Sequence, residues 1–458
     1  MLKVSVGVVL AAAVAAAALA TLGGCRKRVA YDLVVITPHN ERIEREFELA
    51  FSAWHKEKFG KEIRIQWLKP GGGSTATQQL INQYANADTS GIDICFGSGA
   101  PDHMLLASKG ILVPVELPPE TLAQLPVEIN GIRQYDPQHR WYGTVVSCFG
   151  ILYNKKLLEQ YKIPPPRIWD DLASPALFGR LCAADAAQSS SARAAYELII
   201  QSAASRDGRT PDWPAGWGRL LKLFANCNRF TAGASDVPPM IANGQVLAGL
   251  AIDQYAYMQM TTPGGDDLGF ALVPGSTAFT PDPISLLKGA PHEQTARRFI
   301  EFVLSERGQA LFCLPIGVPN GPVEHALYRQ PIRRDLYEKY AGKMLPQLVH
   351  PFVQTQPLVY DVEAADIRMG LLLGPLMKAA VLDSREQLVQ AWKAILDAGL
   401  PEALVNEFVS LPDDLADRQT ALETARGLAS HEQREAATSA WQRYFRDKYN
   451  RIIRQAGK

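Results

Sequence analysis

The sequence predicts an α/β fold with parallel strands, because three consecutive units each contain a short apolar run, a loop and a stretch with helical periodicity. The strands are expected at 32–37, 63–68 and 92–96, and the helices at 41–59, 76–86 and 102–109. In the first helical stretch, apolar residues recur every three or four positions. Such units form a parallel sheet with helices on both faces, and ligands bind beyond the carboxyl ends of its strands.

The loops that end these three strands carry small or hydroxyl residues immediately before a helix. Exposed amides and the positive end of the helix dipole favour a negatively charged or oxygen-rich ligand there. The alternative is that the glycines are plain turn residues and the hydroxyls are N-caps. The loop at 71–75 is not a P-loop, since no Gly-Lys-Ser/Thr completes it. The candidate ligand-binding residues of this region are Thr37, His39, Gly73, Ser74, Thr75, Ser98 and Gly99.

A long extended segment, Trp141–Leu158, lies near the middle of the chain. It predicts one long strand or two strand pieces with a break, followed by a helix that Asn154 caps. Gly143, Ser147 and Gly150 allow a bend or a close ligand approach. The plain alternative is an ordinary buried strand and helix. The segment resembles the crossover strand of bacterial extracellular solute-binding proteins, the capture subunits of ABC importers, in which a "YG…G…YNK" run joins two lobes.

The first 24 residues have the layout of a secretory signal peptide, with one positive charge and then a nearly unbroken apolar run. Leu22-Gly23-Gly24-Cys25 resembles a lipobox, which implies lipidation of Cys25. An uncleaved membrane anchor is the alternative, because the run is almost long enough to span a bilayer. Both interpretations place the protein outside the cytoplasmic membrane, in the periplasm or on the cell surface.

The composition is that of a globular chain with 47 basic and 47 acidic residues, which argues against a nucleic-acid partner. Five cysteines follow Cys25, widely spaced and without a CxxC pair, so free buried thiols are expected. The alternative is one disulfide, between Cys182 and Cys227, which an oxidising compartment would allow. The eight histidines form no HExxH pattern.

Two further stretches resemble the second lobe of the same family. Residues 164–172, containing Trp-Asp-Asp-Leu, match a run that follows the crossover helix, and 244–256 match a stretch whose loop faces the cleft. The resemblance implies ligand contacts from both lobes. The candidates it adds are Tyr142, Ser147, Ser189, Ser190, Ser191, Asp253 and Tyr255, with Arg193 as a possible charge. Tyr255 is also a possible metal ligand. Ferric-binding relatives have adjacent tyrosines, whereas Ala256 separates Tyr255 from Tyr257 here, which puts a ferric site in doubt.

The stretch from 282 to 309 resembles the family's return to the first lobe, with an amphipathic helix at 291–309, and 317–320 resemble its closing loop. The rest of the chain is mostly helical, and the resemblance fades after about residue 392. The predicted organisation is a signal peptide at 1–24, lobe 1 at 25–144, lobe 2 at 145–272, the return to lobe 1 at 273–340 and a helical region at 341–458.

The resemblance implies a two-lobed type II periplasmic binding protein with a hinge and a helical C-terminal extension. It would be a monomeric, lipid-anchored subunit without cofactor or catalytic activity that delivers a small solute to an ABC permease. A ferric or metal chelate and a phosphonate or phosphate-type anion both stay open as ligands, with a polyamine behind them. The alternatives are a sensor or accessory lipoprotein, and an extracytoplasmic hydrolase. For the latter, Gly97-Ser98-Gly99 lacks the nucleophile elbow.

Overall fold

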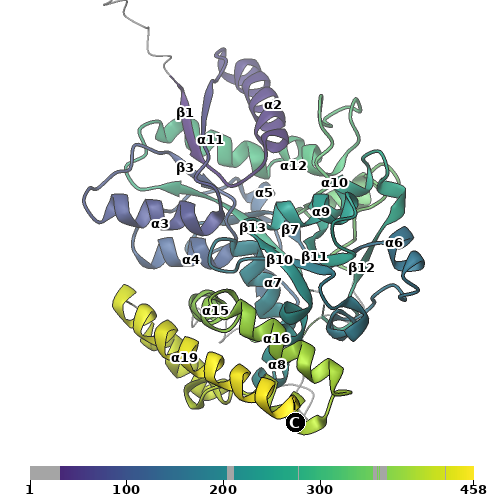
Figure 1. Ribbon diagram of the computed structural model, residues 1–458. Coiled ribbons are helices and arrows are strands. Elements are labelled where there is room, and N and C mark those ends of the chain that lie inside the picture. The colour runs from purple at the N-terminus through teal and green to yellow at the C-terminus, as the bar shows by residue number, and fades with distance from the viewer. Residues whose placement is uncertain are drawn as a thin grey trace, which may run out of the picture.

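The computed structural model contains two main sheets flanked by helices (Figure 1). It describes residues 31–203, 211–276, 278–353, 358, 361, 369–428 and 430–457. The predicted signal segment 1–24 and the predicted lipidation site Cys25 lie outside these residues. In the part of the chain that the structure describes, no helix combines the length and apolar character needed to cross a bilayer.

The first sheet has seven strands and forms the centre of the first lobe. They are β1 (Leu33–Ile36), β2 (Ile65–Leu68), β3 (Ile94–Phe96), β4 (Leu112–Val113), β7 (Tyr142–Ser147), β13 (Thr280–Leu287) and β14 (Gln330–Pro331). The order is β14-β7-β13-β3-β1-β2, with β4 paired to β13. As predicted, β1 is parallel to β2 and β3, so the carboxyl ends of these three strands meet at one edge. A separate hairpin joins β5 (Glu128–Ile129) and β6 (Ile132–Arg133).

The first lobe's helices pack on both faces of this sheet (Figure 1). They are α2 (Glu41–Phe59), α3 (Gly73–Tyr84), α4 (Ala100–Ser108), α5 (Pro119–Leu122), α11 (Glu293–Leu304), α12 (Glu306–Cys313) and α13 (Asp335–Lys339). The predicted apolar face of α11, which includes Phe299 and Ile300, is fully buried. The single helix expected at 291–309 is corrected to two, because Ser305 is extended and its hydroxyl caps α12 by accepting the Gly308 amide.

The second sheet has five strands in the order β10-β9-β11-β8-β12. Its strands are β8 (Phe149–Asn154), β9 (Leu181–Ala184), β10 (Cys227–Thr231), β11 (Ala248–Ile252) and β12 (Leu268–Leu272). Its helices are α6 (Lys155–Gln160), α7 (Ser190–Gln201), α8 (Trp213–Asn226), α9 (Val237–Ala242) and α10 (Asp253–Met260). β12 pairs antiparallel with β8 and therefore belongs to this sheet. The chain re-enters the first sheet with β13.

The crossover forms two strand pieces with a break, one of the two forms predicted. β7 belongs to the first sheet, β8 belongs to the second, and only Cys148 lies between them. Asn154 ends β8 and caps α6, where its side chain accepts the Leu157 amide at 3.0 Å. The chain therefore passes between the sheets at Cys148 and returns between β12 and β13. The domain limits given above remain a prediction.

The C-terminal helices pack against the second lobe and share its apolar core (Figure 1). They are α15 (Met369–Met377), a π-helical turn (Lys378–Leu382), α16 (Arg385–Asp397), α17 (Glu402–Val409), α18 (Arg418–Gly427) and α19 (His431–Ala456). Trp392 of α16 is buried and donates its indole N–H to the Asn226 side chain of α8 at 2.9 Å. The extension is thus an integral part of the second lobe.

All five cysteines among the described residues are free and buried, so the disulfide considered between Cys182 and Cys227 is absent. These two residues lie on neighbouring parallel strands, but Cys227 is in register with Leu181 and Cys182 is in register with Arg229. Burial raises the pKa of both thiols, which keeps them neutral.

Candidate functional site

A cavity of about 510 Å³ lies between the two lobes. Its first-lobe wall comes from the loops that follow β1, β2 and β3, as the carboxyl ends of those strands predicted. Its second-lobe wall comes from the start of α7, the turn after β10 and the start of α10. The crossover residue Ser147 and the β13 residues Thr280 and Asp282 lie at the floor.

Three helix N-termini open into this cavity, α3 and α4 from the first lobe and α7 from the second. The N-caps of α3 and α4 are Gly72 and Gly99, and neither helix has a side-chain cap. The first amides of α3, and those of Ser190 and Ser191 in α7, donate no hydrogen bond within the described part of the chain. Amides of this kind need an acceptor, and a ligand oxyanion is a suitable one.

The first turns of α3 and α7 approach each other so closely that only glycine fits at the contact. A Cβ at Gly72 would lie 2.5 Å from the Gln188 carbonyl oxygen. A Cβ at Gly73 would lie 2.5 Å from Ser190 Oγ and 2.8 Å from Ser98 Cα. The glycines of this loop therefore allow the two lobes to meet beside the cavity.

The loop after β3 holds Ser98 in a strained conformation. Gly97, Ser98 and Gly99 have φ values of 97°, 88° and 79°, a region that a non-glycine residue rarely adopts. His103 Nε2 donates to the Gly97 carbonyl at 2.6 Å, and burial lowers the pKa of the His103 imidazole to about 4, which keeps it neutral. Ser98 Oγ is buried, lines the cavity and has no hydrogen-bond partner. Strain of this kind occurs where a side chain serves a site.

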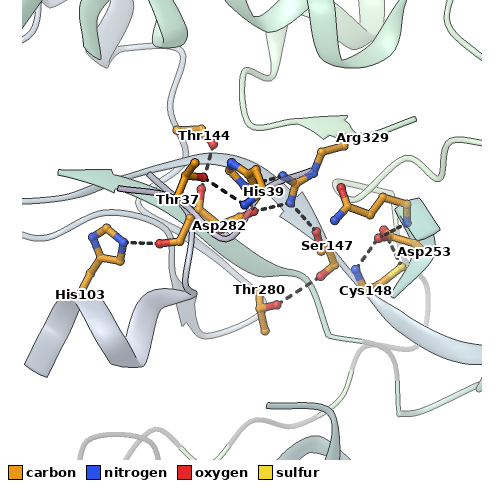
Figure 2. A network of polar contacts seen from close by, with 12 residues as sticks. Thr37, His39, His103, Thr144, Ser147, Cys148, Asp253, Thr280, Asp282 and Arg329 are labelled. Carbon is orange, nitrogen blue, oxygen red and sulfur yellow. Dashed lines mark hydrogen bonds and ion pairs between the residues drawn. The ribbon is translucent and has the colours of Figure 1, made fainter. Parts of the chain in front are cut away.

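A network of charged groups forms the floor of the cavity (Figure 2). Asp282 Oδ2 accepts from Arg329 Nη2 at 2.5 Å and lies 2.9 Å from His39 Nε2. Arg329 Nη2 also lies 3.3 Å from Ser147 Oγ. Burial alone would raise the pKa of the Asp282 carboxyl, but Arg329 and His39 hold it well below its ordinary value. The charge of Arg329 is therefore balanced by Asp282, while Arg329 Nε and His39 Nδ1 are buried without a partner.

A second ion pair spans the two lobes. Arg193 of α7 places Nη2 3.4 Å from Asp102 Oδ1 of α4, and both side chains line the cavity. Asp102 is only 5% exposed, and its other oxygen, Oδ2, has no hydrogen-bond partner. Burial raises the pKa of this carboxyl against the opposing effect of Arg193.

Most of the predicted ligand-binding residues line this one cavity. They are His39, Gly73, Thr75, Ser98, Gly99, Ser147, Ser189, Ser190, Ser191 and Tyr255. Thr37 lies just outside, where its Oγ1 accepts the His39 amide at 3.1 Å. Ser74 does not line the cavity either, although its Oγ is buried without a partner. The residues that line the cavity are placed where they can contact a ligand, and their roles in binding are a proposal.

The expected cleft positions of Tyr142 and Asp253 are corrected, because neither side chain lines the cavity. Tyr142 is buried in the first sheet and donates its hydroxyl to the Val115 carbonyl at 2.7 Å. Asp253 Oδ2 accepts from the Cys148 amide at 3.0 Å and from the Gln330 amide group at 2.6 Å (Figure 2). Asp253 thus satisfies the backbone where β7 ends and β8 begins.

Tyr255 and Tyr257 belong to helix α10. Tyr257 packs against Phe270 with ring centroids 5.4 Å apart, as expected for a core residue, and does not line the cavity. Of these two tyrosines, Tyr255 lines the cavity, and burial raises the pKa of its phenol. In the described ranges, no group of three or more His, Cys, Asp or Glu side chains is placed to hold a metal ion.

Sequence reasoning missed several residues of the cavity wall. Asp102, Gln254, Asp282 and Arg329 all line it. Asp102 stands three residues beyond the loop glycine Gly99, a helix position where an acidic residue is also expected for capping. Arg329 carried no local signal, because the fold brings it to Asp282 from 47 positions along the chain.

The chain crosses between the two lobes twice, and one cavity lies between them. This arrangement defines a two-lobed binding protein of type II topology. Residues 51–331 match the family model described as bacterial extracellular solute-binding protein. The chain therefore belongs to the bacterial extracellular solute-binding protein family.

Among curated proteins, the phosphoglycerate transport regulatory protein PgtC of Salmonella typhimurium is 32% identical over 166 residues, which are 36% of this chain. The match spans only 39% of that relative's length. Among solved structures, the periplasmic binding protein AfuA from Actinobacillus pleuropneumoniae, with fructose-6-phosphate bound, has a TM-score of 0.58 at 17% identity, over 79% of this chain and 97% of its own. A ferric binding protein from Campylobacter jejuni has a TM-score of 0.55 at 16% identity, over 75% and 98%. The likeness to these structures shows the fold.

Proposed function

We propose that this protein captures a small phosphorylated organic solute between its lobes and delivers it to an ABC permease. The observation that carries the proposal is the convergence of three helix N-termini on one cavity, two of them without a side-chain cap. Free amides at the positive ends of helices bind phosphate oxygens well. Arg193 adds a guanidinium to the same wall.

The size of the cavity favours an organic solute over a bare ion. About 510 Å³ falls within the range of small-molecule pockets, roughly 300–1,000 Å³. The unpartnered atoms of Ser98, Gln254 and Asp102 offer hydrogen bonds to the rest of such a ligand. The name of one similar protein refers to phosphoglycerate, and the structure of another has fructose-6-phosphate bound, and both agree with a phosphorylated hydroxy compound. A ferric ligand is disfavoured, since Tyr255 is the only tyrosine that lines the cavity among the residues that the structure describes.

The proposal includes ligand contacts from the lining residues. It also includes a lipid anchor at Cys25, which holds the protein in the periplasm or at the cell surface, and a monomeric state. We propose contacts to the anion from Gly73, Thr75, Gly99, Ser190 and Arg193, with the floor network supporting the remainder of the ligand. Hinge closure would bury the ligand between the lobes and supply the affinity.

A thermal-melt panel on the full chain in mild detergent tests this proposal. 3-Phosphoglycerate, fructose 6-phosphate and a phosphonate should raise the midpoint with concentration, because binding adds about 2.7 kcal/mol at 100 times the dissociation constant. Glycerate and fructose, which lack the phosphate, are the matched controls and should give no shift. A shift confined to ferric citrate or to polyamines would refute the phosphate proposal.

A second candidate function is a sensor or accessory protein that binds the same solute without delivering it. The word "regulatory" in the name of the Salmonella relative favours keeping this candidate. Uptake of labelled solute by cells that lack the protein separates the two, because loss of a capture subunit abolishes uptake whereas loss of a sensor changes permease expression.

A further inference from the structure

The first sheet has a second exposed edge, at the opposite end of its strands from the cavity. The loops that follow β1 and β2 line the cavity, so the amino ends of these parallel strands lie at the far edge. α2 ends at the same edge, because Lys61, just beyond it, forms an ion pair with Asp32 at the start of β1. β1 and α2 lie at the top of Figure 1, on the far side of the molecule from the C-terminal helices.

Two aromatic side chains are exposed at this edge. Phe59, the last residue of α2, is 44% exposed, and Tyr31, two residues before β1, is 38% exposed. The guanidinium of Arg298 lies over the Phe59 ring at 3.6 Å from the centroid. Exposed aromatic rings beside long basic side chains are typical of a membrane–water interface, where the ring lies at the level of the lipid headgroups.

Three cations at this edge form no ion pair in the part of the chain that the structure describes. They are Lys58, Arg64 and Arg298. A cation in the last turn of a helix is ordinary because it complements the helix dipole, and this accounts for Lys58. It does not account for Arg64, which precedes β2, or for Arg298, which belongs to α11.

The acidic side chains beside these cations are already occupied. Asp32, Glu57 and Glu62 each form an ion pair with another basic residue. The three unpaired cations therefore leave a positive charge at this edge, next to the two exposed rings.

The sequence between the proposed lipid anchor and this edge is short. Six positions separate Cys25 from Tyr31, which gives a reach of at most about 22 Å. Three of the residues between them are basic, Arg26, Lys27 and Arg28. A bilayer that holds Cys25 is therefore within reach of the exposed rings and the unpaired cations.

We propose that this edge, made up of Tyr31, Lys58, Phe59, Arg64 and Arg298 and called here the entry surface, contacts an anionic phospholipid bilayer. The inference rests on the lipid anchor that the proposed function includes. The rings lie among the headgroups, and the cations are attracted to the negative charge of the lipids. Because the cavity is at the opposite edge of the sheet, this contact directs the cavity away from the bilayer, toward the solution that supplies the solute.

The test uses the full chain, purified from membranes with its anchor and reconstituted in vesicles. The vesicles contain phosphatidylcholine alone or mixed with phosphatidylglycerol, and the lipids are brominated near the headgroup end of the acyl chain, which quenches nearby tryptophan. The probe is Phe59→Trp, measured as the difference from the wild-type emission. The matched control is Tyr161→Trp, since Tyr161 of the second lobe is 49% exposed and has the Arg180 guanidinium over its ring at 4.2 Å.

In vesicles with phosphatidylglycerol, the probe at position 59 should be quenched about twofold or more over the control, because the cations add attraction to an anionic surface. Lys58→Glu with Arg64→Glu, added to the Phe59→Trp protein, should remove this quenching. Lys155→Glu with Lys156→Glu, which changes two exposed lysines at the start of α6, should leave it in place.

Equal quenching of the probe and the control, or quenching that survives the charge reversal at positions 58 and 64, would overturn the inference. Calorimetry with 3-phosphoglycerate on the same vesicles separates this result from the proposed function. Ligand binding without quenching would overturn the inference alone, whereas quenching without ligand binding would overturn the phosphorylated-solute function alone. Release of the chain from the vesicles in a flotation assay would overturn the anchor and the inference with it.

Discussion

At the scale of single residues, Ser98 connects backbone strain to the proposed site. Its φ of 88° costs on the order of 1 kcal/mol for a residue with a Cβ. Ser98→Gly should therefore leave the free energy of unfolding unchanged or raise it by up to about 1 kcal/mol, while it removes an unpartnered hydroxyl from the cavity. We expect stability to be kept and 3-phosphoglycerate binding to weaken about fivefold or more, as measured by urea denaturation and calorimetry.

Asn130→Gly is the matched control for this variant. Asn130 has a φ of 51° in the turn between β5 and β6 and lies outside the cavity, so the substitution relieves similar strain without touching the site. Unchanged binding in Ser98→Gly would contradict the role proposed for the hydroxyl.

His103 predicts a pH dependence of stability. Its folded pKa of about 4 lies below the ordinary histidine value, so the unfolded chain binds the proton more readily. The neutral imidazole's contribution is complete above about pH 6.5 and is lost as the pH falls toward 4. Between pH 7 and 5 the wild-type protein should lose about 2 kcal/mol more than His103→Asn in urea denaturation. Equal losses in the two proteins would contradict this origin.

At the scale of elements, the contact between α3 and α7 makes closure depend on glycine. A methyl group at Gly72 would meet the Gln188 carbonyl at 2.5 Å and force the lobes apart. Gly72→Ala should weaken 3-phosphoglycerate binding at least tenfold in calorimetry while each lobe stays folded. Gly427→Ala is the control, because a Cβ at Gly427 meets nothing within 4 Å. Normal binding by Gly72→Ala would show that the lobes need not meet here.

Local patterns in the sequence predicted the elements well where periodicity and capping determine them. The helix at 41–59 matches α2, which Asn40 caps and Gly60 ends in the left-handed conformation. Asp253 was misplaced because the same residue type suits a cleft and a buried backbone acceptor. The partner that decides between them, Cys148, lies 105 positions away.

The same limit applies to the candidate site. The sequence predicted the cavity-lining residues at the starts of α3, α4 and α7, because the loops at the carboxyl ends of parallel strands lie at one edge of a sheet. Asp282 and Arg329 were missed because their significance arises only when β13 and the chain before β14 meet.

At the scale of the whole molecule, the C-terminal helices complete the core of the second lobe. Trp392 is 2% exposed and stacks on Phe408 with ring centroids 5.0 Å apart. Trp392→Ala should destabilise the protein by about 3–5 kcal/mol, the usual cost of such a truncation. In hydrogen exchange, α8 and β9 should lose protection while β1 and β3 keep theirs. The exposed Val127→Ala is the control, and equal loss in both lobes would contradict an extension that belongs to the second lobe.

The whole account depends on a ligand held by helix N-termini from both lobes. Hydrogen exchange of the full chain with and without saturating 3-phosphoglycerate tests this most directly, because each amide reports its own hydrogen bond. We predict slowed exchange at the first turns of α3, α4 and α7 together, and no change at the start of α2, whose amides Asn40 already caps. Binding that leaves all three first turns unprotected would contradict the central claim.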